Sequence, residues 1–211
     1  MVTEKQLKRA HEYDFLKTIE LKNFVAVKGH DFSKPFNFKE FLESFRTTGF
    51  QATNLGVAID IIRKMRKDKV KIILTYTSNL VTSGLRDVIA YLVKNKLVHA
   101  VCTTGGGVEE DIMKCLRPFA LGDFKGDAKE LYVKGLNRTG DIYVGDDVYM
   151  DFEKFLLPIL ERFYQRQLKE NKIVGTPELV AELGKEINNE SSILYCAFKN
   201  DIPVFAPGRV R

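Results

Sequence analysis

"VKIILTYTSNLVTSGLRDVIAYLVKNKLVHAVCTTGGGVEEDIMKCLRPF", residues 70–119, decides the fold of this 211-residue chain. It opens with the β-rich run "VKIILTYTS" (70–78), which is followed by the helical pattern "GLRDVIAYLVKNK" (84–96). A second strand pattern, "LVHAVCTT" (97–104), leads into a second helical pattern, "VEEDIMKCLRPF" (108–119). Two strands that each feed a helix predict a βαβα unit, hence an α/β fold with a parallel sheet and right-handed crossovers.

The rest of the chain predicts further helices around this unit. Apolar spacing indicates helices over 38–49, 53–69, 151–170 and 176–188. The second of these would be capped by Thr53 or Asn54, and the fourth by Thr176 with Pro177 at its first position. Pro158 predicts a bend in the third. The Gly- and Asp-rich stretch 122–149 predicts loops with short strands, and 191–207 predicts one more helix and one more strand.

Gly29 and Pro35 interrupt the helical pattern near the amino end. We therefore expect a helical arm over residues 1–28, with a helix at 3–22, followed by one domain over 29–211.

The last predicted strand, "IPVFAP" (202–207), should point its carboxyl end at the crevice where open α/β sheets bind ligands. The sequence stops four residues later, so the sheet looks incomplete at its C-terminus. Either this strand is the edge of the sheet, or the remaining half of the domain is missing.

Composition narrows the class of protein. The formal net charge of +5 is mild, and the basic run "RKMRKDKVK" (63–71) lacks the interleaved aromatic residues of a nucleic-acid platform. We interpret the run as the solvated end of a helix and expect no nucleic-acid partner. Cys102, Cys115 and Cys196 form no C-x-x-C pair and sit among apolar neighbours, which predicts reduced, buried thiols in a cytosolic protein.

Metal and membrane partners are not expected. The three histidines show no ligand spacing with the cysteines, so no zinc site is predicted. No apolar stretch approaches the roughly 18 residues that would cross a membrane, and the amino end lacks an apolar signal core. These features predict a cytoplasmic protein without a membrane partner.

The residues that could bind a ligand lie at the ends of two predicted strands. "YTSNLVTSG" (76–84) places hydroxyl and amide side chains at a strand-to-helix turn, where they could cap the helix or bind a nucleotide. "TTGGGVEED" (103–111) places three glycines at the second turn, where they permit close backbone approach and positive φ. It is not the dinucleotide fingerprint, which requires G-x-G-x-x-G and a later ribose-binding acid.

The acids that follow the glycines limit the possible ligand. Glu109, Glu110 and Asp111 would lie in the first helical turn, where the helix dipole favours them and where they would repel a phosphate. Successive helical residues point about 100° apart, so the three cannot face solvent equally. One carboxylate could accept hydrogen bonds from ribose hydroxyls and another could hold an organic cation, so we expect a site for sugar hydroxyls and amines.

Five motifs in fixed order resemble the N-terminal portion of deoxyhypusine synthase. They are "TGFQATN" (48–54), "YTSNL" (76–80), "TTGGGVEED" (103–111), "GKEINN" (184–189) and "IPVFAP" (202–207). The resemblance implies a Rossmann-like NAD-binding sheet flanked by helices. It implies NAD-dependent transfer of the 4-aminobutyl group of spermidine, through an imine on an enzyme lysine, to a lysine of the translation initiation factor 5A precursor.

The resemblance also implies roles for individual residues. The implied NAD-binding set is Ser78, Asn79, Leu80, Val81, Thr82, Thr104, Gly105, Gly106 and Glu110. Glu109 and Glu110 would hold a positive amine of spermidine. The acidic pair then meets a polycation, with which charge-assisted hydrogen bonds are strong.

One departure from the family bears on activity. After "IPVFAPG" the family continues with a "TDG" stretch and later a glycine-rich segment that bears the imine-forming lysine, whereas this sequence ends in "RVR". No lysine here lies in a matching motif, so we expect no catalytic residue in this chain. Two hypotheses follow: a catalytic component that needs a complementary lysine-bearing chain or segment, or an inactive regulatory subunit that activates an active paralogue. The family further implies a homo- or hetero-tetramer.

Overall fold

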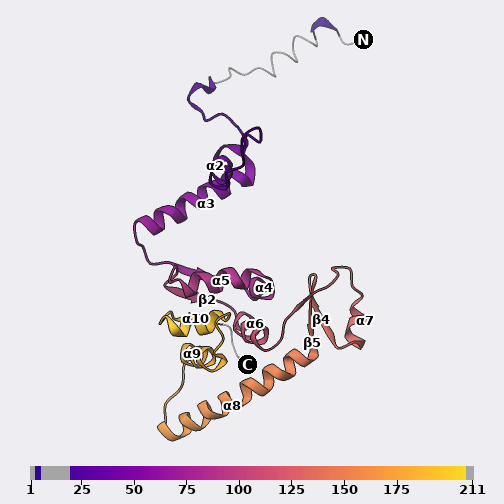
Figure 1. Ribbon diagram of the computed structural model, residues 1–211, viewed down its shortest axis with the longest axis vertical. Coiled ribbons are helices and arrows are strands. Elements are labelled where there is room, and N and C mark those ends of the chain that lie inside the picture. The colour runs from indigo at the N-terminus through magenta and orange to yellow at the C-terminus, as the bar shows by residue number, and fades with distance from the viewer. Residues whose placement is uncertain (1–2, 6–19, 208–211) are drawn as a thin grey trace. The chain divides into compact units, whose positions relative to one another are not determined.

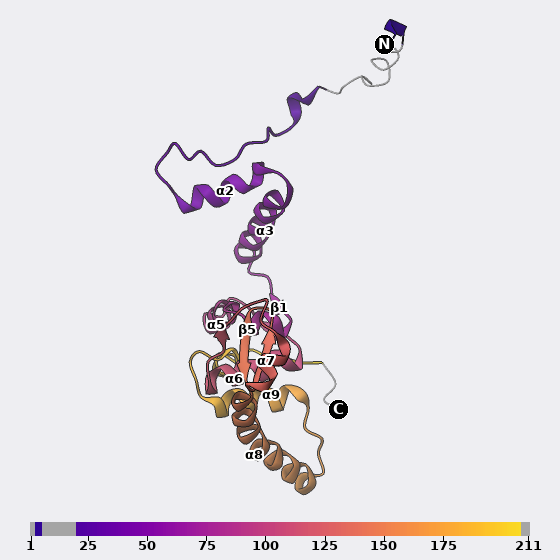
Figure 2. The same cartoon turned by 90° about the vertical axis from the view of Figure 1, so that its right-hand side faces the viewer.

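The computed structural model describes residues 3–5 and 20–207, which form two compact units, 1–70 and 71–211 (Figures 1 and 2). Most of the predicted arm helix at 3–22 lies outside the described residues, as does the "GRVR" end. The boundary predicted at residue 28 stays a prediction. No helix in the described ranges is long and apolar enough to cross a membrane.

In the first unit, the 3-10 helix Leu21–Asn23 precedes α2 (Phe38–Thr48) and α3 (Phe50–Lys67). The predicted end of α2 near Gly49 is confirmed. The predicted cap of α3 at Thr53 or Asn54 is wrong, because α3 starts at Phe50. Gly49 has φ +97°, a conformation that glycine adopts freely, so the chain reverses within one residue and helix resumes at once.

In the second unit, β1 (Ile73–Thr75), β2 (Ala100–Cys102) and β6 (Val204–Phe205) form a parallel sheet in the order β1-β2-β6. The predicted α/β fold with a parallel sheet is therefore confirmed. After β1 come the short helix α4 (Ser78–Thr82) and α5 (Leu85–Lys94), and after β2 comes α6 (Gly105–Leu116).

The sheet buries one face more deeply than the other. Val101 and Val204 are buried, whereas the neighbouring side chains Ile73 and Phe205 are 66% and 44% exposed. Because successive side chains of a strand point to opposite faces, the core lies on the side of Val101 and Val204.

A second, antiparallel sheet follows α6 in the order β3-β5-β4. It contains β3 (Ala120–Leu121), β4 (Leu136–Thr139) and β5 (Ile142–Gly145), and α7 (Ala128–Val133) lies between β3 and β4 in the chain. The prediction of short strands among loops is confirmed here, while α7 was missed. Figure 2 shows β5 and α7 near the N-terminal start of α8, which follows β5 directly in the chain.

Three helices complete the unit: α8 (Asp146–Glu170), α9 (Thr176–Ile187) and α10 (Ile193–Lys199). α8 begins five residues earlier than predicted and continues through Pro158. α9 is capped by Gly175 and not by Thr176 as predicted, which places Pro177 one position further into the helix. α9 packs on α10, and both lie near β2 in Figure 1.

Candidate functional site

The two predicted turns lie side by side at the carboxyl ends of β1 and β2, and α4 packs against α6. The contact depends on Gly106, where an added Cβ would lie 3.0 Å from Cβ of Ser78. Gly107 is tighter still, since its Cβ would lie 2.2 Å from Oγ1 of Thr103. Gly106 and Gly107 therefore serve close approach, as predicted, whereas a Cβ at Gly105 would meet only Glu109 Oε1, at 3.9 Å. None of them has positive φ, because all three are helical.

The acidic residues do not lie in the first turn of α6. The helix begins at Gly105, so Glu109 and its two successors occupy the second turn. The dipole explanation for these acids is therefore wrong. The expected repulsion of a phosphate does not depend on it, because a Cβ at Gly105 in the first turn would lie 3.9 Å from Glu109 Oε1. The glycines were predicted to precede the helix, but Thr104 has extended backbone and takes the N-cap position itself.

The three acids have three different environments, as their angular spacing predicts. Glu109 is exposed, Glu110 is half-buried, and Asp111 has no exposed surface. Each must therefore have its own role.

Glu110 turns inward to the first predicted turn. The Thr82 hydroxyl donates a hydrogen bond to its carboxylate, which links α4 to α6. Burial raises the pKa of the Glu110 carboxyl, whereas the Thr82 hydroxyl and the nearby Lys114 ammonium lower it. Burial outweighs them, so the net shift is upward.

Glu109 faces a different space. It lines a hollow of about 130 Å³ whose other walls are mostly apolar side chains of α6, α8 and α9, with Thr176 as the other polar side chain. Phe152, Leu179 and Leu183 are among these walls, and Ala206, just after β6, closes one side. Glu109 is the charged group in this lining. A carboxylate on an apolar hollow suits an alkyl ammonium ion, whose methylene groups and charge are both accommodated.

Tyr149 of α8 lies close enough to Glu109 and Glu110 to be affected by their charges. Burial raises the pKa of its phenol, and the negative charges of Glu110, Asp146 and Glu109 raise it further. Sequence reasoning missed this residue, because it lies at the end of a stretch interpreted as loop.

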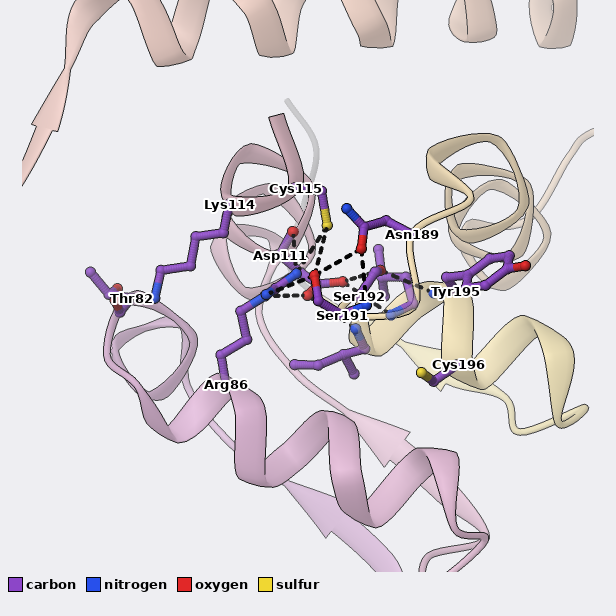
Figure 3. Close-up of polar contacts among 12 residues, drawn as sticks. Thr82, Arg86, Asp111, Lys114, Cys115, Asn189, Ser191, Ser192, Tyr195 and Cys196 are labelled. Atoms are coloured by element: carbon purple, nitrogen blue, oxygen red, sulfur yellow. Dashed lines mark hydrogen bonds and ion pairs between the residues drawn. The ribbon is translucent and has the colours of Figure 1, made fainter. Parts of the chain in front are cut away.

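Asp111 is the centre of a buried network that joins three helices (Figure 3). Arg86 Nε of α5 donates to Asp111 Oδ1 at 2.7 Å. Ser192 Oγ donates to Asp111 Oδ2 at 2.6 Å, and the main-chain N–H groups of Ile193 and Leu194 donate to the same carboxylate. The side chains of Arg86 and Asp111 are 6% and 0% exposed, so the charge pair is buried and fully hydrogen-bonded.

Sequence reasoning missed Arg86 and Ser192. The available signal was that Arg86 shares a helical face with Ile89, Ala90 and Val93, all of which are buried. A charged residue on an apolar face indicates a buried partner.

Lys114 ties the end of α4 to α6. Its Nζ donates to the main-chain oxygens of Thr82 at 2.5 Å and Ser83 at 2.9 Å. Figure 3 shows the Lys114 side chain reaching toward Thr82. Burial lowers the pKa of this ammonium, and the nearby Arg86 lowers it further. The Lys114 amine is therefore engaged with the turn.

The predicted ligand-binding residues divide by exposure. Asn79, Leu80 and Thr104 are exposed at the edge of the sheet, whereas the side chains of Val81 and Thr82 are buried. A ligand at the first turn would therefore meet the main chain of Val81 and not its side chain. Ser78, Gly105 and Gly106 are half-buried between the two turns.

Buried hydrogen-bonding groups remain unsatisfied beneath these turns. The Tyr76 and Thr103 hydroxyls follow β1 and β2 directly, and in the described part of the chain neither makes a well-formed hydrogen bond, although Thr103 lies near enough to Tyr76 to lower the pKa of its phenol. Burial, followed by the charge of Asp111, raises the pKa of the Tyr76 phenol.

The cysteine prediction holds in part: all three thiols are free, but only Cys196 is buried, and Cys102 and Cys115 are partly exposed.

Comparison with known proteins identifies the family. The fold and site define an α/β protein with its candidate site at the carboxyl edge of a parallel sheet. The family model for deoxyhypusine synthase matches residues 40–210, and the chain belongs to the deoxyhypusine synthase family. The chain is 44% identical to deoxyhypusine synthase of Nicotiana tabacum, over 87% of this chain and 55% of that protein.

Two further relatives agree. Deoxyhypusine synthase of Arabidopsis thaliana is 43% identical over 86% of this chain and 56% of its own length. A crystal structure of a candidate deoxyhypusine synthase from Entamoeba histolytica aligns with a TM-score of 0.63 and 29% identity, over 86% of this chain and 66% of that chain. The chain thus spans just over half the length of the curated relatives that it matches.

Proposed function

We propose that this chain supplies the NAD- and spermidine-binding part of a cytoplasmic deoxyhypusine synthase with a Rossmann-like sheet. The activity is transfer of the 4-aminobutyl group of spermidine to a lysine of the translation initiation factor 5A precursor. The observation that carries the proposal is the divergence of the two glutamates: Glu110 faces the first turn, and Glu109 faces an apolar hollow.

The turns support a bound dinucleotide. Gly106 lets the turns approach closely, and the unsatisfied hydroxyls of Tyr76 and Thr103 lie below them. Residues 78–82 and 104–106 would hold NAD, with Glu110 accepting a hydrogen bond from a ribose hydroxyl. NAD would supply the oxidation of spermidine.

The glutamates support a polyamine. Glu109 would bind a protonated amine of spermidine at the hollow, and Glu110 would add its negative charge from the side of the first turn. The apolar hollow beside Glu109 would exclude water from the methylene groups of spermidine. Charge-assisted hydrogen bonds in such a desolvated site are stronger than neutral ones.

The covalent step requires a lysine from elsewhere. Lys114, the lysine nearest to the acidic pair in sequence, donates to two carbonyl oxygens and is not free to act as a nucleophile. We therefore propose that a complementary lysine-bearing chain or segment completes the site within a homo- or hetero-tetramer.

Calorimetric titration of the chain with NAD and with spermidine tests the proposal. We expect weak binding of each ligand, and tighter binding when a lysine-bearing partner is present. Glu109→Gln should weaken spermidine binding about tenfold, while Glu153→Gln, an exposed change on α8, should not. Unchanged spermidine affinity in Glu109→Gln would refute the role of this carboxylate.

The alternative is an inactive subunit that activates a paralogue. The hydrogen bond that occupies the Lys114 amine is equally consistent with this alternative and with the proposed catalytic component. Addition of the chain to intact tobacco deoxyhypusine synthase separates the two. A rise in the tobacco enzyme's rate, without binding of either ligand to this chain, would support the regulatory role.

A further inference from the structure

Both oxygens of the Asp111 carboxylate are held by two donors each. Oδ1 accepts hydrogen bonds from Arg86 Nε and from the main-chain N–H of Ile193, the latter at 3.1 Å. Oδ2 accepts from Ser192 Oγ and from the main-chain N–H of Leu194, the latter at 3.0 Å. The carboxylate therefore cannot turn without breaking bonds to two elements, α5 and the start of α10.

The main chain at Asp111 is held as well. A second guanidinium nitrogen of Arg86, Nη2, donates to the Asp111 carbonyl oxygen at 3.1 Å. One arginine thus binds both the side chain and the backbone of a single residue of α6. Both side chains are buried, so water does not compete for these bonds. The network therefore fixes the rotation of α6 about its own axis at this residue.

The two glutamates directly precede this fixed residue. Successive helical residues point about 100° apart, so the rotation of α6 at Asp111 sets the directions of Glu110 and Glu109. At a side-chain radius of about 5 Å, a rotation of about 20° moves a carboxylate by about 2 Å. Such a shift is enough to break the hydrogen bond from the Thr82 hydroxyl to Glu110.

The other contacts between α6 and α4 restrain this rotation less. Lys114 reaches the carbonyls of Thr82 and Ser83 through a flexible four-carbon side chain. Gly106 lets the helices approach but has no side chain that would resist turning. The Asp111 network, by contrast, combines a planar guanidinium fork with two main-chain N–H groups, which are rigidly placed donors.

We propose that Asp111 is a positioning residue for the glutamate pair. The bonds from Arg86 and from the start of α10 hold α6 in the rotation that directs Glu110 to the turn after β1. This inference rests on the proposed function, in which the glutamates bind a polyamine. It gives Ser192 an effect on ligand binding, although the Ser192 hydroxyl bonds Asp111 and the Tyr195 N–H and not a glutamate.

A double-mutant cycle separates positioning from simple stabilisation. Ser192→Ala removes a donor to Asp111 on the α10 side, and Thr82→Val removes the donor to Glu110 on the α4 side. If α6 transmits the restraint, Ser192→Ala already loosens the bond that Thr82→Val removes. The unfolding equilibrium constant of the double variant, measured in urea, should then be about fivefold smaller than the two single effects multiplied together predict. Effects that simply multiply overturn the inference.

Asn200→Ala supplies the matched control for this cycle. Asn200 lies at the other end of α10 and donates to the carbonyls of Val93 and Lys94, both at 3.0 Å. It ties α10 to the end of α5 and not to α6. Its effect and that of Thr82→Val should multiply. Coupling of the same size in this control would show that any loosening of α10 reaches α4, which overturns a specific role of Asp111.

Titration of Arg86→Lys with spermidine reports the effect on the ligand. The change keeps a positive charge beside Asp111 but replaces the fork with one ammonium group, which cannot hold the carboxylate and the carbonyl in the same geometry. We expect about fivefold weaker binding at a temperature at which circular dichroism shows the variant to be fully folded. If Arg86→Lys does not fold, Ser192→Ala takes its place with the same expectation.

The two measurements separate this inference from the proposed function. Wild-type spermidine affinity in a fully folded variant is the result expected if the pair only stabilises the fold, and it overturns the positioning role. Coupling between Ser192 and Thr82 in a chain that binds neither NAD nor spermidine would confirm the positioning of Glu110 and refute the proposed function.

Discussion

The Thr82 hydroxyl donates a hydrogen bond to the carboxylate of Glu110, which joins the turn after β1 to the helix after β2. The two side chains lie 28 residues apart in the sequence. The bond holds Glu110 toward the first turn, and because successive helical residues point about 100° apart, Glu109 faces a different part of the candidate site. The predictions below test the contacts that hold this arrangement.

Replacement of Asp111 by Asn should destabilise the fold strongly. Asp111→Asn leaves the Arg86 guanidinium buried without its counter-charge, and breaking one partner of a buried pair costs about 3 kcal/mol or more. Urea denaturation measures the free energy of unfolding. Glu178→Gln, which breaks an exposed ion pair with Arg166, is the control and should cost less than about 1 kcal/mol. Equal effects of the two changes would contradict the stabilising role of the buried network.

Alanine should be tolerated at Gly105 but not at Gly107. An added Cβ at Gly107 would lie 2.2 Å from Thr103 Oγ1 and 3.3 Å from two carbons of the same buried side chain, so rotation of that side chain offers little relief. We expect Gly107→Ala to lower the free energy of unfolding by about 2 kcal/mol. At Gly105 the Cβ would meet only Glu109 Oε1, at 3.9 Å, and the change should stay within about 1 kcal/mol. Thermal denaturation of both variants provides the comparison.

Replacement of Glu110 by Gln should change how stability depends on pH. The pKa of Glu110 is raised above its ordinary value of 4.5, so the folded chain holds this proton more tightly than the unfolded chain. The contribution of Glu110 to stability therefore falls as pH rises from about 4.5 through the raised pKa. Glu110→Gln removes this decline, so the stability of the variant relative to wild type should increase over that range.

The free energy of unfolding at pH 4 and pH 7 measures this effect. Thr82→Val should enlarge the decline with pH, because it removes the hydroxyl that lowers the Glu110 pKa. A Glu110→Gln variant whose stability parallels wild type at both pH values would show that this carboxyl does not respond to its burial.

Replacement of Lys114 by Met should loosen the end of α4. Lys114→Met keeps the length of the side chain but removes the donor to the carbonyls of Thr82 and Ser83. Loss of charged hydrogen bonds predicts destabilisation by about 1.5 kcal/mol. The Ser83 amide, which donates to Asn79 O at 3.2 Å, should also exchange faster. Lys154→Met on the exposed face of α8 is the control, and a matching effect there would argue against a specific role of Lys114.

Local pattern was enough to predict the βαβα unit, because the strands around Leu74 and Val101 and the amphipathic face of α5 are short-range features. The end of α2 was predicted from Gly49, whose φ of +97° suits glycine. The start of α3 was not, because no residue after Gly49 signals that the helix resumes immediately.

The sequence predicted which residues of the candidate site lie close together, but not how their side chains are arranged. The proximity of residues 78–82 to 104–106 follows from the order of parallel strands, which sequence reveals. The sequence predicted that Glu109 and Glu110 point in different directions. It placed them in the wrong turn of α6, because the three glycines obscured where the helix begins. The Asp111 network joins positions about 80 residues apart, a separation that periodicity does not report.

The Asp111 network also has a consequence for synthesis on the ribosome. Ser192, Ile193 and Leu194 supply hydrogen bonds that the buried carboxylate requires. A nascent chain that has emerged only as far as α8 holds this charge without them, so α5 and α6 cannot settle into their final packing before the start of α10 has emerged. The glutamate pair becomes fixed only after α10 has left the exit tunnel.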